Sequence, residues 1–313
     1  MKKRIIISLF VLVLVMGVLA GCSNESNEEE VVVKDPTDQI SESDVLETTD
    51  DYGKTVMFVT PPQKIISLAP SHTEILFALG IGDRVVGVTT FDDYPQEVND
   101  IERIGDFNGN NLERIIELEP ELVINYGEGI QEENQRLEEA GIAVIGFLPE
   151  SIDEIYLTIE RIGRLTGVSD KAEELILSLK TREEAALSKI KDAPKRKVFY
   201  EIWHEPLMAA GPGSFLDELM KLAGGENIAA DADSPYPNYD LEQLIERNPE
   251  VYLTSNDFPE KTVESIKTRS GYENMDAVLN NRVYILDGNI MSRPGPRIID
   301  ALEILVQSIH PEL

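Results

Sequence analysis

From Gln63 onward, short apolar runs alternate with stretches in which apolar residues recur at helical spacing. Short apolar runs bounded by turn residues are typical of buried strands, and apolar positions at i, i+3 and i+4 are typical of helices. The expected strands are 64–68, 84–88, 122–125, 142–147, 196–202, 251–254 and 283–286. The expected helices are 71–79, 112–118, 131–140, 151–165, 214–222, 241–247 and 297–309. Strands that alternate with helices predict parallel sheets covered by helices, which is an α/β fold.

The longest helical pattern without an intervening strand runs from about Ser169 to Lys191. Strand–helix alternation precedes it and resumes after it, so it is typical of a connector between two lobes. We expect an N-terminal α/β lobe over 61–167, a connector helix over 168–193 and a C-terminal α/β lobe over 194–313. The ligand cleft is expected between the two lobes.

An internal repeat supports two related lobes. The segment from Asn111 to Ile124 (NLERIIELEPELVI) matches the segment from Asp240 to Leu253 (DLEQLIERNPEVYL) in register. A weaker echo pairs Ser71–Leu76 with Ser214–Leu219. Chance likeness between capped short helices is the alternative, but two echoes in the same order favour a duplication.

The first 60 residues have a different character. A positive start and an apolar run over 5–19, too short to span a bilayer comfortably, predict an export signal. Leu-Ala-Gly-Cys at its end resembles the bacterial lipoprotein signal, which implies that residues 1–21 are removed and that Cys22 is lipidated. The alternative is an ordinary signal peptide with a chance cysteine. Residues 22–60 are acidic and rich in Ser, Asn and Thr, so we predict a flexible tether.

Charge and motif content narrow the function. The formal net charge of -30 disfavours nucleic acid as a partner, because phosphate binding needs a basic surface. The chain contains no phosphate loop, nucleophile elbow or zinc-protease motif, so no enzymatic activity, cofactor or metal is expected. His72 lies in an apparent capping box, Ser71 to Glu74, and is interpreted as a helix-start residue. His204 follows a predicted strand, where its side chain could face a cleft, and is a minor candidate for contact with a ligand.

Aromatic residues gather in the loops that follow or precede the predicted strands and helices. In α/β sheets, ligands bind at the carboxyl ends of the strands. An aromatic pocket with few polar groups suits a large, flat, partly apolar ligand, although each aromatic considered alone could simply pack its loop. The candidates are Phe91, Tyr94, Phe107, Tyr126, Trp203 and Tyr236.

Two glutamates, Glu113 and Glu242, occupy the same place in the two copies of the repeat. Each falls in the first turn of a predicted helix, where a negative charge is favourable in any case. Their symmetry suggests a second role, in which one acid on each lobe grips a basic socket of a two-fold partner.

The chain from about residue 63 to 310 resembles the periplasmic cobalamin-binding proteins and the related ferric-siderophore and haem receptors. The first lobe carries this resemblance through IISLAPSHTE (65–74), DYP (93–95) and NLERI with PELVI (111–124). The second lobe carries it through GGENI (224–228), PYP (235–237) and RPGPRI (293–298). The resemblance implies an extracytoplasmic, monomeric binding protein that delivers ligand to an ABC permease dimer with ATPase subunits.

The resemblance also implies roles for single residues. Phe91, Phe107, Tyr126 and Tyr236 fall on aromatics that face the corrin ring, and Arg293 falls on an arginine of the last loop. The acidic companion of that arginine falls on Asn289, which departs from the family pattern. Phenylalanines of the loop after the connector helix are replaced by Trp203 and Met208. Glu113 and Glu242 fall on the two acids that dock the permease.

Three other interpretations stay open. Within the same family, the ligand is a ferric siderophore or haem, and for haem Tyr126 or His204 would be the iron ligand. The same two-lobed fold can also host an enzyme that acts on a metal complex, or a surface lipoprotein with no ligand. The lipoprotein-type signal and the family resemblance together predict a protein outside the cytoplasm, anchored to the cell membrane by lipid.

Overall fold

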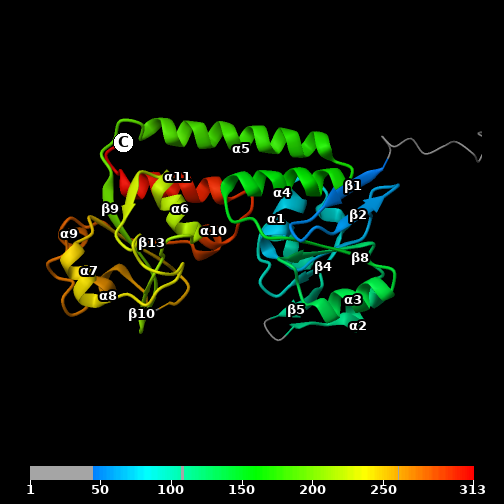
Figure 1. Cartoon of the computed structure of the whole chain (residues 1–313), viewed down its shortest axis with the longest axis horizontal. Coiled ribbons are helices and arrows are strands. Elements are labelled where there is room, and N and C mark those ends of the chain that lie inside the picture. Colours follow the sequence, from blue (N-terminus) through cyan, green and yellow to red (C-terminus); the bar gives the residue numbers. More distant parts are fainter. Residues whose placement is uncertain (1–44, 107–108, 260) are drawn as a thin grey trace, which may run out of the picture. The chain divides into compact units, whose positions relative to one another are not determined.

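The computed structural model describes residues 45–106, 109–259 and 261–313. These residues form two α/β lobes joined by one long helix, α5 (Ser169–Lys189), as the sequence predicts (Figure 1). The predicted signal peptide and Cys22 lie outside the described residues, as does Phe107. In the described part of the chain, no helix is long and apolar enough to cross a membrane.

The first lobe is built on a six-stranded sheet in the order β6-β5-β4-β3-β7-β8, parallel except for β5 with β6. Its strands are β3 (Ile65–Ser67), β4 (Val85–Thr89), β5 (Arg103–Asp106), β6 (Gly109–Asn110), β7 (Leu122–Tyr126) and β8 (Ala143–Phe147). Its helices are α1 (Pro70–Ala78), α2 (Leu112–Glu117), α3 (Gln131–Glu139) and α4 (Ile152–Leu165), with short 3₁₀ helices at Gly82–Arg84 and Gln96–Asp100.

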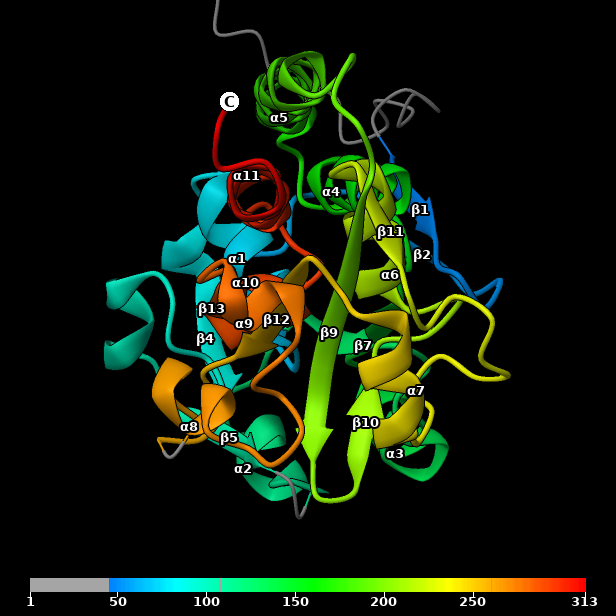
Figure 2. The ribbon, with the colours of Figure 1, turned by 90° about the vertical axis from the view of Figure 1, so that its left-hand side faces the viewer.

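The second lobe is built on a sheet in the order β10-β9-β12-β13, with β11 also paired to β9. Its strands are β9 (Arg196–His204), β10 (Leu207–Ala209), β11 (Gly225–Asn227), β12 (Val251–Ser255) and β13 (Val283–Leu286). Its helices are α6 (Phe215–Leu222), α7 (Leu241–Arg247), α8 (Val263–Lys267), α9 (Asp276–Leu279), α10 (Gly288–Ser292) and α11 (Ile298–Ile309). Figure 2 shows this lobe with β9 running through it.

The repeat seen in the sequence has a matching structure in each lobe. Glu121 follows α2, and its carboxylate accepts a hydrogen bond from the backbone N–H of Lys64 at 3.1 Å. The equivalent Glu250 accepts from the backbone N–H of Lys197 at 3.0 Å. Each of these lysines donates its ammonium to the end of the repeated helix, at Leu118 O and Arg247 O. Matching contacts made by matching residues support a duplicated origin of the two lobes.

The connector packs on helices of both lobes. Arg182 of α5 donates to Asp300 and Glu303 of α11, and Tyr156 of α4 donates to Glu183 of α5. Since α4 belongs to the first lobe and α11 to the second, α5 lies along both (Figure 1).

The prediction of a flexible tether over residues 22–60 is wrong for its last part. Residues 46–58 form an antiparallel hairpin of β1 (Leu46–Thr49) and β2 (Thr55–Phe58), which packs against α4 and β8. Asp50 closes its turn by accepting from the N–H groups of Tyr52 and Lys54. The acidic composition led to the wrong prediction, because acidic residues are typical of solvent-exposed segments. Here Asp50 and Asp51 instead accept hydrogen bonds from backbone N–H groups and help to fix the segment.

The predicted capping box at the start of α1 is also wrong. The helix begins at Pro70, and no side chain caps its N-terminus. A proline needs no hydrogen bond for its nitrogen at the first helical position, so a cap is less necessary there. Glu74, which the pattern assigned to the cap, is buried and points instead to arginines of the other lobe.

Candidate functional site

A cavity of about 410 Å³ lies between the two lobes. The first lobe contributes the end of β7 and the loop after β8, with Tyr126 and residues 148–150. The second lobe contributes strand ends and the loops beside them, with residues from β9, β12, α6 and α10. A cavity at the carboxyl ends of parallel strands is where α/β proteins bind ligands. Its volume is within the range of small-molecule pockets.

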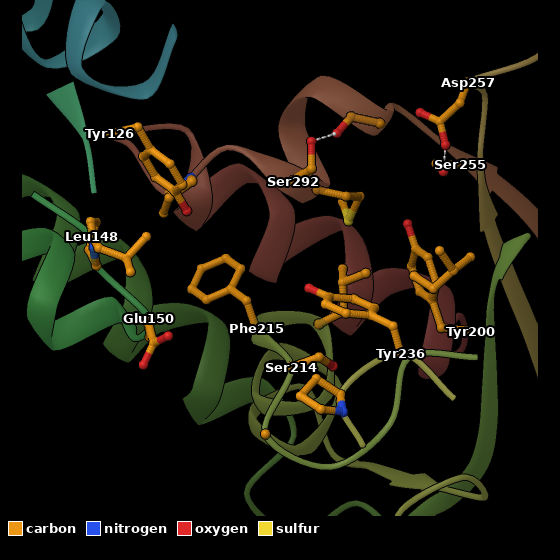
Figure 3. Close-up of a pocket in the computed structure, with 18 residues that line it drawn as sticks. Tyr126, Leu148, Glu150, Tyr200, Ser214, Phe215, Tyr236, Ser255, Asp257 and Ser292 are labelled. Carbon is orange, nitrogen blue, oxygen red and sulfur yellow. Dashed lines mark hydrogen bonds between the residues drawn. The ribbon is translucent and has the colours of Figure 1, made fainter. Parts of the chain in front are cut away.

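Aromatic rings from both lobes line this cavity (Figure 3). Tyr126 faces it from the first lobe, and Phe215, Tyr236 and Tyr200 face it from the second. Tyr126 and Tyr236 are about half exposed, at 46% and 51%, so their ring faces are available to a ligand. Burial raises the pKa of the Tyr126 hydroxyl, which therefore stays protonated at neutral pH.

A buried histidine lies beneath Tyr126. The His72 ring centroid is 6.0 Å from that of Tyr126 and 6.0 Å from that of Phe147. His72 is fully buried, and neither ring nitrogen has a hydrogen-bond partner among the described residues. Burial lowers its pKa to about 4, so the ring is neutral at pH 7. It belongs to the wall behind Tyr126 and does not line the cavity.

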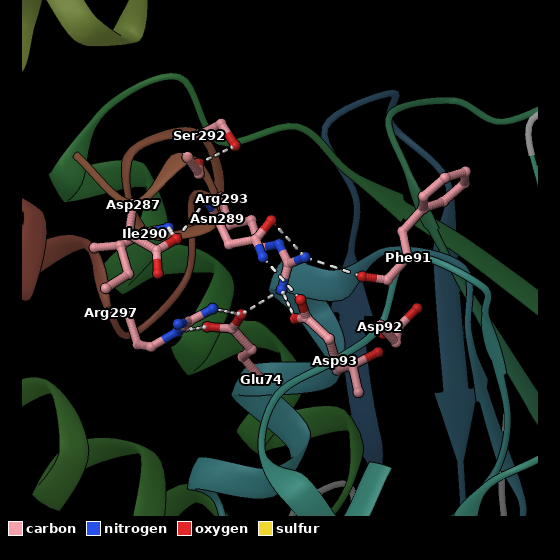
Figure 4. Close-up of polar contacts among 12 residues, drawn as sticks. Glu74, Phe91, Asp92, Asp93, Asp287, Asn289, Ile290, Ser292, Arg293 and Arg297 are labelled. Atoms are coloured by element: carbon pink, nitrogen blue, oxygen red, sulfur yellow. Dashed lines mark hydrogen bonds and ion pairs between the residues drawn. The ribbon is translucent and has the colours of Figure 1, made fainter. Parts of the chain in front are cut away.

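A second polar cluster joins the lobes beside the cavity, and we call it the interlobe clasp (Figure 4). It consists of Glu74 and Asp93 from the first lobe, and Asn289, Arg293 and Arg297 from the second. Arg297 pairs with Glu74 through two hydrogen bonds, at 2.9 and 2.6 Å. The Glu74 side chain is only 2% exposed, so this ion pair is largely shielded from water.

Arg293 is fully engaged within the clasp. Its guanidinium donates to Asp93 Oδ1 at 2.5 Å, to the backbone O of Phe91 at 2.9 Å and to Asn289 Oδ1 at 2.9 Å. It also approaches Glu74 Oε1 at 3.4 Å. Asn289 in turn donates to Asp93 Oδ2 at 2.7 Å. The Arg293 side chain is 12% exposed and does not line the cavity.

The other predicted site residues lie in several places. Phe91 contributes its backbone oxygen to the clasp, while its ring points away from it (Figure 4). Tyr94 lies under the Arg297 guanidinium, with 4.2 Å from the Arg297 Cζ to the ring centroid. Trp203 packs edge-on against Phe258 and is not among the cavity residues. Of the eight predicted ligand-binding residues, the cavity wall includes Tyr126 and Tyr236.

Sequence reasoning missed much of the cavity wall. Phe215 opens α6 and was assigned to a helix, and Tyr200 sits inside β9 and was assigned to a strand. Ser255 and Asp257 come at the end of β12, where the rule that ligands bind at strand ends could have found them. Glu150 precedes the capped helix α4, and its sequence context resembles any helix start.

Glu113 and Glu242 occupy equivalent exposed positions. Each lies in the first turn of its helix, in α2 and α7, after an N-cap residue that accepts from a backbone N–H. The two helices lie on the side of their lobes away from α5 (Figure 1).

Comparisons with known proteins identify the family of the chain. Residues 65–290 match the family model described as periplasmic binding protein. The chain belongs to this family. It is 35% identical over 309 residues to YvrC of Bacillus subtilis (strain 168), an ABC transporter substrate-binding lipoprotein, and the match covers 96% of each chain.

Two solved structures share the fold over 80% of this chain and 98% of their own. The crystal structure of the periplasmic vitamin B12 binding protein BtuF of Vibrio cholerae has a TM-score of 0.70 and 28% identity. The apo structure of the periplasmic heme-binding protein RhuT from Roseiflexus sp. RS-1 has a TM-score of 0.71 and 27% identity.

These relatives define the general role of the molecule. It is a substrate-binding protein of an ABC importer, in the group that includes vitamin B12 and haem binding proteins. Members of this family are non-enzymatic transport components that bind a ligand and deliver it to a permease. The family and the lipoprotein relative indicate an extracytoplasmic location.

Proposed function

We propose that this binding protein captures cobalamin or a related corrinoid and delivers it to its permease. The chain itself is not an enzyme, and ATP is hydrolysed by separate subunits. In this proposal Cys22 carries a lipid that holds the monomer at the outer face of the cell membrane, and Glu113 and Glu242 contact the permease.

One observation carries the choice of ligand, namely a cleft with aromatic rings on both walls. Rings from two lobes suit a ligand with a broad, flat, partly apolar body, because each lobe can cover one side of it. A corrin macrocycle has this form. Cobalamin is larger than the cavity of about 410 Å³, so part of it would extend from the cleft into solvent.

The charges around the cleft weigh against an anionic ligand. The arginine expected to meet the ligand, Arg293, already donates to Asp93, Asn289 and the backbone of Phe91. A siderophore with several negative charges, or haem with its two propionates, needs cationic side chains as partners. Arg293 and Arg297 already pair with acidic side chains of the interlobe clasp.

Haem stays the second candidate because RhuT shares the fold and Tyr126 faces the cleft. Tyrosine binds ferric iron as the phenolate, and the raised pKa of Tyr126 opposes loss of its proton. His204 is the other candidate iron ligand, but it lies beside Glu205 and is not among the residues that line the cavity.

Isothermal titration tests the proposal. The full chain in a mild detergent is titrated with cyanocobalamin, dicyanocobinamide, haemin and a ferric hydroxamate. We expect one-to-one binding of the two corrinoids. Tyr236→Ala should weaken that binding by about 5- to 150-fold, since stacking on an aromatic ring is worth about 1–3 kcal/mol.

The matched control is Leu177→Ala, which removes an exposed apolar side chain from α5 and should leave affinity unchanged. Binding of haemin or the hydroxamate in place of the corrinoids would reject the corrinoid proposal and leave the role of an importer binding protein intact.

A further inference from the structure

The described cavity residues carry negative charge and no positive charge. Glu150 lies at the end formed by the first lobe, and Asp257 lies at the opposite end, formed by the second (Figure 3). Among the described residues that line the cavity there is no lysine, arginine or histidine. A ligand that spans the cleft therefore meets a carboxylate at each end and aromatic rings between them.

Asp257 is held in place by the strand ends around it. Ser255 donates its hydroxyl to Asp257 Oδ2, and Gly288 lies directly against Oδ1, where any Cβ would collide with it. Asn256 ties the same loop to β13 and α10, because its N–H donates to Leu286 O at 2.9 Å and its side chain accepts from the Gly288 N–H at 3.0 Å. A carboxylate accepts about four hydrogen bonds, and Ser255 supplies one.

Glu150 is held by a different element, the hairpin of β1 and β2. Asp51 in the hairpin turn accepts from the N–H of Leu148 at 2.8 Å and also pairs with Arg161 of α4. The Glu150 N–H donates to Glu154 at 2.7 Å, which fixes the backbone just before α4. The exposed Glu150 side chain therefore lies at the rim of the cleft, on a loop with a restrained backbone.

We propose that Glu150 and Asp257 are specificity-determining residues that select ligands whose rim carries hydrogen-bond donors, above all primary amides. A carboxylate accepts from an amide N–H, whereas a carboxylate of the ligand in the same place would face a like charge. This inference rests on the proposed corrinoid function and adds that amidated corrinoids are bound and their acidic counterparts rejected. The two acids act on the rim of the ligand, and the aromatic rings act on its face.

Two corrinoids with the same ring test the inference. Dicyanocobinamide carries amides around the corrin, and dicyanocobyrinic acid carries carboxylates in their place. The full chain in detergent is titrated with each at pH 7. We expect the amide form to bind at least a hundredfold more tightly, because two charge-assisted contacts, each worth about tenfold, are replaced by repulsions.

Asp257→Asn and Glu150→Gln keep the side-chain shape and remove the charge. Each should lower the preference for the amide form about tenfold, and the double variant should lower it about a hundredfold. The control Glu184→Gln removes the same charge from an exposed position on α5 and should leave the preference unchanged. Melting temperatures of all variants identify any that fail to fold.

The outcomes separate the two proposals. If neither corrinoid binds the wild-type chain, the corrinoid function is rejected, and this inference with it. If both bind equally, or if the double variant keeps the wild-type preference, corrinoid binding stands and the role of the two acids is rejected. A preference that falls equally in Glu184→Gln would assign it to net charge and would likewise reject the inference.

Discussion

At the scale of single residues, His72 is buried and no polar contact among the described residues compensates for that burial. It is neutral, fully buried and without a hydrogen-bond partner among the described residues, beneath the ring of Tyr126. A buried histidine without a partner resists protonation, because the charged form would lose its hydration. The result is a folded-state pKa of about 4, against about 6.5 in the unfolded chain.

This shift predicts a pH dependence of stability. As the pH falls below 6.5, the unfolded chain takes up a proton at His72 while the folded chain does not, so stability present above pH 6.5 is lost towards pH 4. Between pH 7 and pH 5 the loss from this residue is about 2 kcal/mol. Urea unfolding of wild type and His72→Leu at both pH values measures it, and the variant should lose about 2 kcal/mol less.

The exposed Leu177 does not titrate and provides the control, since Leu177→Ala should keep the wild-type pH dependence. His310 adds to the same trend, because burial lowers its pKa too. The slope in His72→Leu should therefore become smaller without disappearing. An unchanged slope would mean that His72 titrates normally in the folded protein.

At the scale of elements, the clasp connects α1 of the first lobe to α10 and the start of α11 in the second. Glu74 is its centre, because it accepts two hydrogen bonds from Arg297 and lies 3.4 Å from Arg293. The backbone passes close as well, since a Cβ on Gly295 would lie 3.1 Å from the backbone O of Ser71. One edge of the cleft is therefore tied by both polar and backbone contacts.

Removing the central charge should weaken this connection. In Glu74→Gln, two partly buried arginines lose a shared carboxylate, and the loss in unfolding free energy should be about 2–4 kcal/mol. The control is Glu303→Gln, which breaks the more exposed pair with Arg182 and should cost under about 1 kcal/mol. Urea denaturation of both variants compares them, and equal losses would show that the clasp is no stronger than a surface ion pair.

The sequence predicts the elements better than the contacts between them. Periodicity locates β7, α4, α7 and α11 to within about two residues, because apolar spacing is local information. It misses the β1–β2 hairpin, where acidic residues accept backbone hydrogen bonds, and it assigns Glu74 to a cap. The partner of Glu74 lies 223 positions further along the chain, and no local pattern encodes a contact at that separation.

The residues of the candidate site also divide into those that local sequence patterns predict and those that depend on contacts between distant segments. Tyr126 and Tyr236 were predicted because aromatics in loops at strand ends are recognisable in sequence. Phe215 and Tyr200 were not, since an apolar residue in a helix or strand looks like core until its surroundings are known. The sequence also could not indicate that Arg293 is engaged by the first lobe, and this contact alters the charge that a ligand meets.

At the scale of the whole molecule, the duplication presents two equivalent acids to a partner. Glu113 and Glu242 are exposed, each begins a repeated helix, and the helices lie on the side of the lobes away from α5 (Figure 1). The cavity is lined by neither residue. Binding of ligand and docking on the permease are therefore expected to be separable by mutation.

The double variant Glu113→Ala with Glu242→Ala should bind corrinoid with wild-type affinity and fail to support its import. Each single variant should keep partial import, because one lobe can still dock. The repeat provides a matched control, since Glu117 and Glu246 are also exposed and occupy the equivalent places one turn later. Uptake of labelled cobalamin is measured in cells that depend on this protein, with titration of the purified variants alongside.

Normal uptake by the Glu113 and Glu242 double variant would exclude these acids from docking, whereas equal loss in the Glu117 and Glu246 pair would assign the effect to general surface charge. Loss confined to the first pair would show that the permease recognises the symmetry that duplication produced.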